Sequence, residues 1–169
     1  GPAWANSLFE DNAEYGYGMF LAQNTLREDL ISKVESVKET ADDAAKAIID
    51  KFLVTKDDVN ANKVAAEELV EVLSKMNTPE AAQILKDKEY LSKKSVWILG
   101  GDGWAYDIGY GGLDHVLASG EDVNIMVFDT EVYSNTGGQS SKASNIGQVA
   151  QFAAAGKAIN KKSLSEIAM

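Results

Sequence analysis

Two glycine-rich loops, each directly after a short apolar run, constrain this 169-residue chain more than any other feature. The run at 96–99 leads into Gly-Gly-Asp-Gly at 100–103, and the run at 123–128 leads into Asp-Thr-Glu-Val-Tyr-Ser-Asn-Thr-Gly-Gly-Gln at 129–139. The stretch between them is long enough for a crossover helix, which predicts a β-loop-α-β unit with two parallel strands. Both loops then lie at the carboxyl edge of the sheet, where open α/β sheets bind ligands.

The residue types in these loops suit a divalent cation that holds a diphosphate against backbone amides. Mg²⁺ takes oxygen ligands in near-octahedral geometry and shares them with substrate phosphates. Asp102, Thr130 and the Val132 carbonyl could supply the protein ligands. Gly101 and Gly103 leave room for a diphosphate beside the carboxylate, and the following helix would direct unpaired N–H groups at the anion. A lone Gly-Asp-Gly is usually only a turn, but two such loops at two strand ends favour a site.

The loops also resemble a known family. The sequence Gly-Gly-Asp-Gly-Trp-Ala-Tyr-Asp-Ile-Gly-Tyr-Gly-Gly-Leu-Asp-His at 100–115, followed by the sequence at 129–143, is similar to the thiamine-diphosphate-binding domain of pyruvate:ferredoxin (flavodoxin) oxidoreductases. The opening segment, 1–18, resembles the same family, whereas residues 26–92 share only a helical pattern with it. The resemblance implies a partial thiamine-diphosphate-binding fold of the α/β class.

The resemblance assigns roles to residues of both loops. Asp102, Thr130 and the Val132 carbonyl would hold Mg²⁺. The residues lining the cofactor diphosphate and thiazolium would be Gly101, Asp102, Gly103, Trp104, Thr130, Glu131, Val132, Tyr133, Ser134 and Asn135. Asn135 would be catalytic, because its amide can hydrogen-bond a substrate oxygen as negative charge develops there. Thr130, where many thiamine enzymes have asparagine, favours the oxidoreductases over the decarboxylase and transketolase branches.

The resemblance also implies an activity for a parent protein. That enzyme would convert pyruvate and coenzyme A to acetyl-coenzyme A and CO₂ and reduce ferredoxin or flavodoxin. The chain has no cysteine, so it cannot ligate the 4Fe–4S clusters of the family. The pyrimidine-side domain of the family has no counterpart here. We therefore expect an inactive diphosphate-side part of a homodimeric enzyme, which the remaining domains would complete.

Two other interpretations stay open at this point. The chain could be a non-catalytic Mg²⁺-diphosphate binding module, or a subunit of another 2-oxoacid oxidoreductase. A dinucleotide-binding Rossmann unit is disfavoured, because no Gly-x-Gly-x-x-Gly follows the first predicted strand.

Charge and hydropathy narrow the expected partners and location. The net charge of −10 disfavours nucleic acid and anionic membrane surfaces. No apolar run approaches membrane-spanning length, and acidic residues stand in the first twenty positions where a signal peptide would be basic. We expect a cytoplasmic protein, with an organelle of an anaerobic eukaryote as the other option.

The chain divides by composition into a helical part and a glycine-rich part. Residues 1–94 are predicted as a mainly helical segment, and 95–169 as the βαβ cofactor-binding core, with parallel strands at about 95–100 and 123–129, of one incomplete domain. The expected helix boundaries are a break near Asp42, a start at Asp58 or Asn62, an N-cap at Thr78 before Pro79, and a last helix at 149–154. Two strands make an undersized sheet, which predicts exposed apolar edges and self-association.

Several conspicuous side chains are expected to have ordinary roles. His115, the only histidine, is expected to be packed or half-exposed rather than to act as a base. Trp104, Tyr106 and Tyr110 are expected to fill core space rather than to stack on a cofactor. Lys142 is expected to be an exposed loop lysine, although it lies close enough in sequence to approach a diphosphate or coenzyme A.

Overall fold

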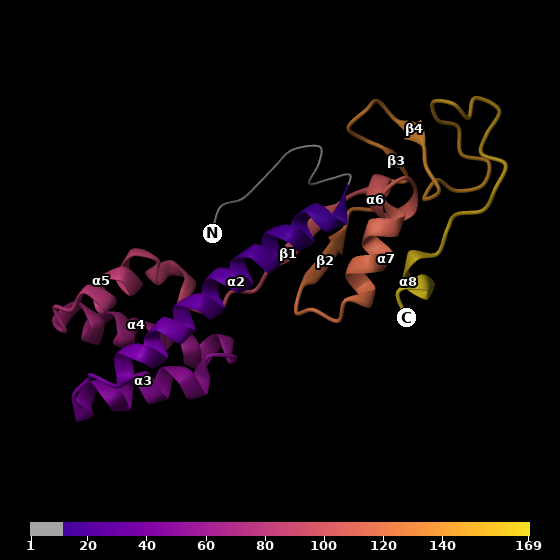
Figure 1. The fold of residues 1–169 in the computed structure, drawn as a ribbon. Coiled ribbons are helices and arrows are strands. Elements are labelled where there is room, and N and C mark those ends of the chain that lie inside the picture. The colour runs from indigo at the N-terminus through magenta and orange to yellow at the C-terminus, as the bar shows by residue number, and fades with distance from the viewer. Residues whose placement is uncertain (1–11) are drawn as a thin grey trace. The chain divides into compact units, whose positions relative to one another are not determined.

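Two parallel strands, β1 (Trp97–Gly100) and β2 (Asn124–Val127), form the sheet that the sequence predicted. Their register pairs Trp97 with Asn124 and Gly100 with Val127. The two strands therefore end at the same edge, and the loops at 101 and 128 both leave from that edge (Figure 1). The prediction of an α/β class with a parallel β1–β2 pair is confirmed.

The computed structural model describes residues 12–169, in two compact units. One unit comprises residues 21–95, and the other comprises residues 12–20 together with 96–169. The part of the family resemblance that rests on residues 1–11 lies outside the described residues. Among residues 12–169, no helix combines the length and the apolar character needed to cross a bilayer.

The crossover between β1 and β2 contains two short helices instead of one. Helix α6 (Asp102–Tyr106) ends at Asp107, whose backbone angles are not helical (φ −125°, ψ −113°), and α7 (Tyr110–Ala118) follows. The carbonyl of Gly103 accepts hydrogen bonds from the N–H groups of both Asp107 and Gly109. These bonds close the first helix and turn the chain into the second.

A small antiparallel hairpin follows the second loop, and the sequence analysis did not predict it. Strand β3 (Val132–Tyr133) pairs with β4 (Gln139–Ser140). The turn between them needs positive φ at Gly137 (115°) and Gly138 (83°), a conformation that glycine adopts without steric cost. The Thr-Gly-Gly sequence of the loop is therefore a hairpin signal as well as a family motif.

The predicted last helix at 149–154 is wrong. Backbone groups there pair with the hairpin instead, because Ser140 N–H donates to the Gln151 carbonyl and Gln151 N–H donates to the Gly138 carbonyl. Phe152 has a positive φ of 64° and is 93% exposed. The apolar spacing of this segment therefore does not reflect burial. The C-terminal segment ends with a short helix, α8 (Leu164–Ile167).

The other unit is a set of helices with the predicted caps. Its elements are α2 (Ala13–Lys38), whose first residues belong to the unit with the sheet, α3 (Asp43–Thr55), α4 (Val59–Lys75), α5 (Pro79–Lys86) and the 3₁₀ helix η1 (Lys88–Tyr90). Asp42, Asp58 and Thr78 each accept backbone N–H bonds at the start of the helix that follows. These caps stop one helix and begin the next, as the sequence analysis expected.

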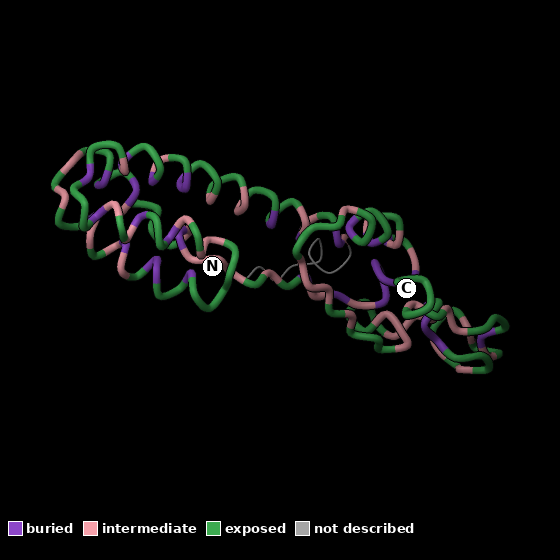
Figure 2. Tube along the Cα trace, turned by 90° about the horizontal axis from the view of Figure 1, so that it is seen from below, coloured by how far each residue is buried: buried purple, intermediate pink, exposed green. Residues whose placement is uncertain are grey.

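Each unit has its own apolar core (Figure 2). The helical unit buries one stripe of each helix, with Phe52, Leu69 and Ile84 among the fully buried side chains. The core of the sheet unit lies between β1, α6 and α7 and comprises Ala13, Ile98, Trp104, Ala105, Tyr106, Leu113, Val116 and Ala143. This second core holds the start of α6, and therefore the first loop, in place.

The small sheet leaves apolar side chains exposed. Trp97, Met126 and Phe128 are each about half exposed, on β1, on β2 and just after β2. The expectation of exposed apolar groups at the sheet is met, because two strands cannot cover their own faces.

Candidate metal centre

The two loops meet at the carboxylate of Asp102. This residue is the first of α6, directly beyond the end of β1, and it is only 3% exposed. Its Oδ1 accepts a hydrogen bond from the backbone N–H of Thr130 at 3.1 Å, and its Oδ2 accepts one from the hydroxyl of Ser141 at 2.7 Å. A single buried carboxylate thus joins the first loop, the second loop and the segment after β4.

The second loop brings two further oxygen atoms together. The hydroxyl of Thr130 donates to the carbonyl oxygen of Val132 at 2.8 Å. Glu131, between them, has a φ of 63°, which turns the chain so that the side chain of one neighbour meets the carbonyl of the other. Asp102, Thr130 and Val132, the three predicted metal ligands, therefore lie in one hydrogen-bonded group.

The electrostatics of the site favour a cation. Burial raises the pKa of the Asp102 carboxyl above its ordinary value, and the hydrogen bonds from Ser141 and Thr130 offset part of that rise. The carboxylates of Asp129 and Asp107 raise the pKa of Asp102 further by charge repulsion. A buried carboxylate with like charges nearby is costly to ionise alone, and an adjacent metal ion removes that cost.

Asp129, the first residue of the second loop, is held by two side chains. The hydroxyl of Tyr106 donates to its Oδ2 at 2.7 Å, and the ammonium of Lys161 lies 2.7 Å from the same atom. Partial burial would raise the pKa of Asp129, but these two hydrogen bonds and the lysine charge outweigh it, so the pKa is lowered. Asp129 is therefore a fixed anion with partners of its own, and it anchors the loop beside Thr130.

Glu131 is held in its left-handed conformation by the segment after β4. Ser144 donates from its hydroxyl to the carbonyl of Glu131, and Asn145 donates from its amide to the carboxylate of Glu131 at 3.0 Å. Lys161 lies 3.8 Å from that carboxylate. Non-glycine residues pay a steric cost at positive φ, and the structure around Glu131 offsets it.

The other predicted site residues are distributed around this group. Gly101 and Gly103 flank Asp102, and the ring of Trp104 is fully buried in the core, as expected of a side chain that fills space. Tyr133 is in β3, and Ser134 and Asn135 lie in the exposed turn of the hairpin. Asn135 is therefore at the surface of this unit, outside the hydrogen-bonded group around Asp102.

The available donors fit a hard, oxygen-preferring cation. Within the described residues, no three His, Cys, Asp or Glu side chains gather into a metal cluster. An ion at this position would instead use one carboxylate with the hydroxyl of Thr130 and the carbonyl of Val132. Mg²⁺ accepts such mixed oxygen sets and commonly keeps waters and phosphate oxygens in its shell, whereas a structural Zn²⁺ site needs nitrogen or sulfur ligands.

Comparison with known proteins identifies the family. No protein-family model matches the sequence. Pyruvate:ferredoxin oxidoreductase of Moorella thermoacetica is 52% identical over 177 residues, covering 100% of this chain and 15% of the relative. Pyruvate-flavodoxin oxidoreductase of Klebsiella pneumoniae is 49% identical over 176 residues, with the same two coverages. The mitochondrial pyruvate dehydrogenase (NADP(+)) of Euglena gracilis is 45% identical over 175 residues, covering 100% of this chain and 10% of the relative.

The chain is a homologous segment of the pyruvate:ferredoxin (flavodoxin) oxidoreductase family. It spans 15% of the length of the first two relatives. The resemblance inferred from the loops is thus confirmed over the whole chain, including the helical residues between 26 and 92 that had shown only a pattern.

The sequence analysis did not identify the residues that hold the two loops after β1 and β2 in place. Ser141, Ser144 and Lys161 hold Asp102, Glu131 and Asp129 respectively. Ser141 lies inside the family motif, which is a signal that could have been used. Lys161 comes from a polar stretch with no distinguishing pattern, so only the folded structure connects it to the second loop.

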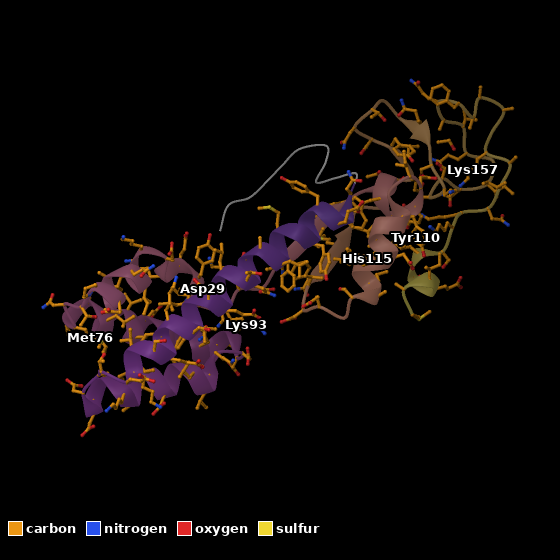
Figure 3. All side chains as sticks on the ribbon, viewed as in Figure 1. Asp29, Met76, Lys93, Tyr110, His115 and Lys157 are labelled. Carbon is orange, nitrogen blue, oxygen red and sulfur yellow. The ribbon has the colours of Figure 1, made fainter. Side chains whose placement is uncertain are left out.

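Three of the five side chains that were expected to have ordinary roles lie on or near α7 or in the segment after β4. His115 is exposed on α7 and makes an edge contact with the ring of Tyr17, with centroids 6.1 Å apart (Figure 3). Lys142 is exposed, and its ammonium lies 3.8 Å from the carboxylate of Asp107. The expectation that Tyr110 fills core space is wrong, because this residue of α7 is partly exposed and lies outside the apolar core. The ammonium of Lys162 lies 3.2 Å from the centroid of its ring (Figure 3). Each of these contacts is a local surface interaction.

Proposed function

We propose that this chain forms the Mg²⁺ and diphosphate side of a thiamine-diphosphate site in a pyruvate:ferredoxin or pyruvate-flavodoxin oxidoreductase. The observation that carries the proposal is the 3.1 Å hydrogen bond between Thr130 N–H and the carboxylate of Asp102. It joins the loops that leave two neighbouring parallel strands. With the Val132 carbonyl 2.8 Å from the Thr130 hydroxyl, oxygen atoms of the kinds that Mg²⁺ takes are gathered at one sheet edge.

In this proposal Asp102, Thr130 and the Val132 carbonyl bind Mg²⁺. Residues 101–104 and 130–135 line the diphosphate and the thiazolium. Helix α6 has only five residues, so its dipole is small and the cation is the main source of attraction for the diphosphate. A chain with a net charge of −10 needs such a local cation to capture an anionic cofactor.

Thiamine diphosphate, when bound, supplies the carbanion chemistry that decarboxylation of a 2-oxo acid requires. The residues of this chain would bind the cofactor and orient it. Asp102 balances the charge of the metal in a buried position, and the glycines beside it let the backbone approach the diphosphate. Asn135, in the exposed hairpin turn, would donate its amide to a substrate oxygen on which negative charge develops.

We infer that the whole protein acts on pyruvate and coenzyme A, releases acetyl-coenzyme A and CO₂, and passes the electrons singly to ferredoxin or flavodoxin. The names of the relatives from Moorella and Klebsiella support pyruvate and these two acceptors. Because the chain has no cysteine, the 4Fe–4S clusters of such an enzyme would be ligated elsewhere in the protein. The segment alone should show no turnover, and a cytoplasmic homodimer is the expected parent.

Calorimetric titration tests the binding part of the proposal. Thiamine diphosphate is added to the 169-residue chain with and without Mg²⁺, and then to Asp102→Ala. We expect Mg²⁺-dependent binding in the original chain and at least about a tenfold loss in the variant, since one charged ligand is removed. Asp114→Ala, which removes an exposed carboxylate on α7, is the matched control and should bind normally. Equal binding by Asp102→Ala and Asp114→Ala would contradict the assignment.

A second experiment separates an enzyme segment from a non-catalytic binding module. The remaining domains of a related oxidoreductase are supplied in trans, and decarboxylation of pyruvate is followed with a ferredoxin or flavodoxin as acceptor. Activity that requires the added chain and is lost with Asp102→Ala supports the enzyme. Cofactor binding without any restored activity favours the module.

A further inference from the structure

Ser141 connects the candidate metal ligand to the segment after β4. It is only 5% exposed, and its hydroxyl donates to Oδ2 of Asp102 at 2.7 Å while it accepts the N–H of Ala143 at 3.0 Å. A serine hydroxyl has a single proton. In this arrangement the proton is directed at Asp102, and one of the two acceptor positions of the oxygen takes the N–H of Ala143.

Hydrogen bonds hold both oxygens of the Asp102 side chain. Each of its oxygens accepts a donor, Oδ1 from Thr130 N–H and Oδ2 from the hydroxyl of Ser141. The two hydrogen bonds therefore fix the orientation of the Asp102 side chain.

A second buried hydroxyl ties the same segment to the other loop. Ser144 accepts the N–H of Ser141 at 2.9 Å and donates to the carbonyl of Glu131. The ammonium of Lys157, which is 7% exposed and lies in the segment after β4, donates to the carbonyl of Ser144 (Figure 3). Two buried serines of one short segment, Ser141 and Ser144, thus hold Asp102 on one side and the turn at Glu131 on the other.

We propose that Ser141 is a positioning residue, which holds the Asp102 side chain in a fixed orientation beside the second loop before any metal arrives. This inference rests on the proposed function. Ser141 acts through Asp102 and is not itself a metal ligand. Hydrogen-bond partners of metal-binding carboxylates typically contribute tenfold to hundredfold to metal affinity, because they fix the ligand in its binding orientation.

The first test is Mg²⁺ affinity. Mg²⁺ is titrated into the 169-residue chain at saturating thiamine diphosphate, and Ser141→Ala is compared with Ser140→Ala. The neighbouring Ser140 is in β4 and keeps its backbone pairing in the variant, so it is the matched control. We expect the Kd for Mg²⁺ to rise about tenfold to hundredfold in Ser141→Ala and to stay unchanged in Ser140→Ala. Ser141→Thr, which restores the hydroxyl, should recover most of the affinity.

The second test needs no metal. Amide hydrogen exchange at Thr130 is measured by NMR in the cofactor-free chain, because this N–H donates to the carboxylate that Ser141 holds. Exchange should be faster in Ser141→Ala than in Ser140→Ala. In an Asp102→Asn background the Ser141→Ala change should add little, since Ser141 is proposed to act through Asp102.

The outcomes separate this proposal from the proposed function. If the original chain binds Mg²⁺ and Ser141→Ala binds it equally well, the positioning role is wrong. If the original chain binds no Mg²⁺ with thiamine diphosphate, the proposed function fails. The rate of amide hydrogen exchange at Thr130 then still decides whether Ser141 positions Asp102. If circular dichroism shows that Ser141→Ala is unfolded, Ser141→Cys takes its place, because a thiol fills the same space but donates weakly.

Discussion

The indole of Trp104 lies directly against the backbone of Gly100. A Cβ atom on Gly100 would be 1.5 Å from Nε1 of Trp104, so the ring would have to move to admit it. Trp104 is fully buried between β1, α6 and α7. The glycine that ends β1 is therefore required by the packing of α6 on the strand, in addition to any role of the loop in binding.

Gly100→Ala should accordingly destabilise the chain strongly. The added methyl group must displace a buried ring, and overpacking of this kind typically costs about 1–3 kcal/mol or more. Gly111→Ala on α7 is the matched control, because a Cβ there meets no atom within 4 Å. That change should be neutral or stabilise the helix by up to about 1 kcal/mol. Urea unfolding followed by circular dichroism measures both, and equal stability of the two variants would contradict the packing argument.

The sequence predicted most of the regular structure where local chemistry determines it. Asp42, Asp58 and Thr78 have short side chains that accept backbone N–H groups, so helix starts could be placed from the chain alone. The two strands were recognisable because each apolar run is followed by a glycine-rich or polar loop. The parallel order followed from the length of the crossover.

The errors lie where long-range contacts decide the structure. The segment at 149–154 has apolar residues at helical spacing, yet it pairs its backbone with Ser140 and Gly138 and exposes Phe152. Side-chain spacing carries no information about such pairing. The links from Ser141 to Asp102 and from Lys161 to Asp129 also join residues more than thirty positions apart, so residue spacing along the chain does not reveal either contact.

Glu131 offers a test of the left-handed turn in the second loop. Its φ of 63° places the hydroxyl of Thr130 beside the carbonyl of Val132. Glu131→Val should lower stability by about 1–2 kcal/mol and weaken Mg²⁺ binding, because a β-branched residue strongly disfavours this conformation. Thermal unfolding and calorimetry with thiamine diphosphate and Mg²⁺ measure the two effects.

Glu131→Gly is the informative partner of that variant. Both changes remove the carboxylate that accepts from Asn145, but glycine adopts a positive φ freely. The glycine variant should therefore be more stable than the valine variant and bind Mg²⁺ better. If the two variants lose stability and affinity equally, the carboxylate contacts of Glu131 matter and its backbone conformation does not.

Asn62 should be essential to the helical unit. Although it lies on α4, it is fully buried, and its Oδ1 accepts the backbone N–H of Lys93 at 2.6 Å. Asn62→Ala removes that acceptor from a partly buried donor and leaves a small cavity, which should cost about 1–3 kcal/mol of unfolding free energy. Asn60→Ala, an exposed asparagine in the first turn of the same helix, should change stability by less than about 0.5 kcal/mol. Chemical denaturation of the two variants gives the comparison directly.

Lys157 should make the stability of the sheet unit depend on pH. Burial lowers the pKa of its ammonium, against a smaller opposing effect of the Asp107 carboxylate. Between the lowered folded pKa and the ordinary lysine pKa, the unfolded chain binds more protons than the folded chain, so this group makes unfolding harder as pH rises. Lys157→Met removes the titrating group and keeps the long unbranched chain.

The free energy of unfolding of the original chain should therefore increase relative to that of Lys157→Met as pH is raised from neutral toward the ordinary lysine pKa of about 10.4. Urea unfolding of both proteins across this range gives the difference at each pH, which cancels the titration of other groups. Lys63→Met, on an exposed position of α4, shows the effect of losing an exposed charge. A difference between the original chain and Lys157→Met that stays constant, or falls, with rising pH would mean that the buried ammonium of Lys157 carries no penalty when charged.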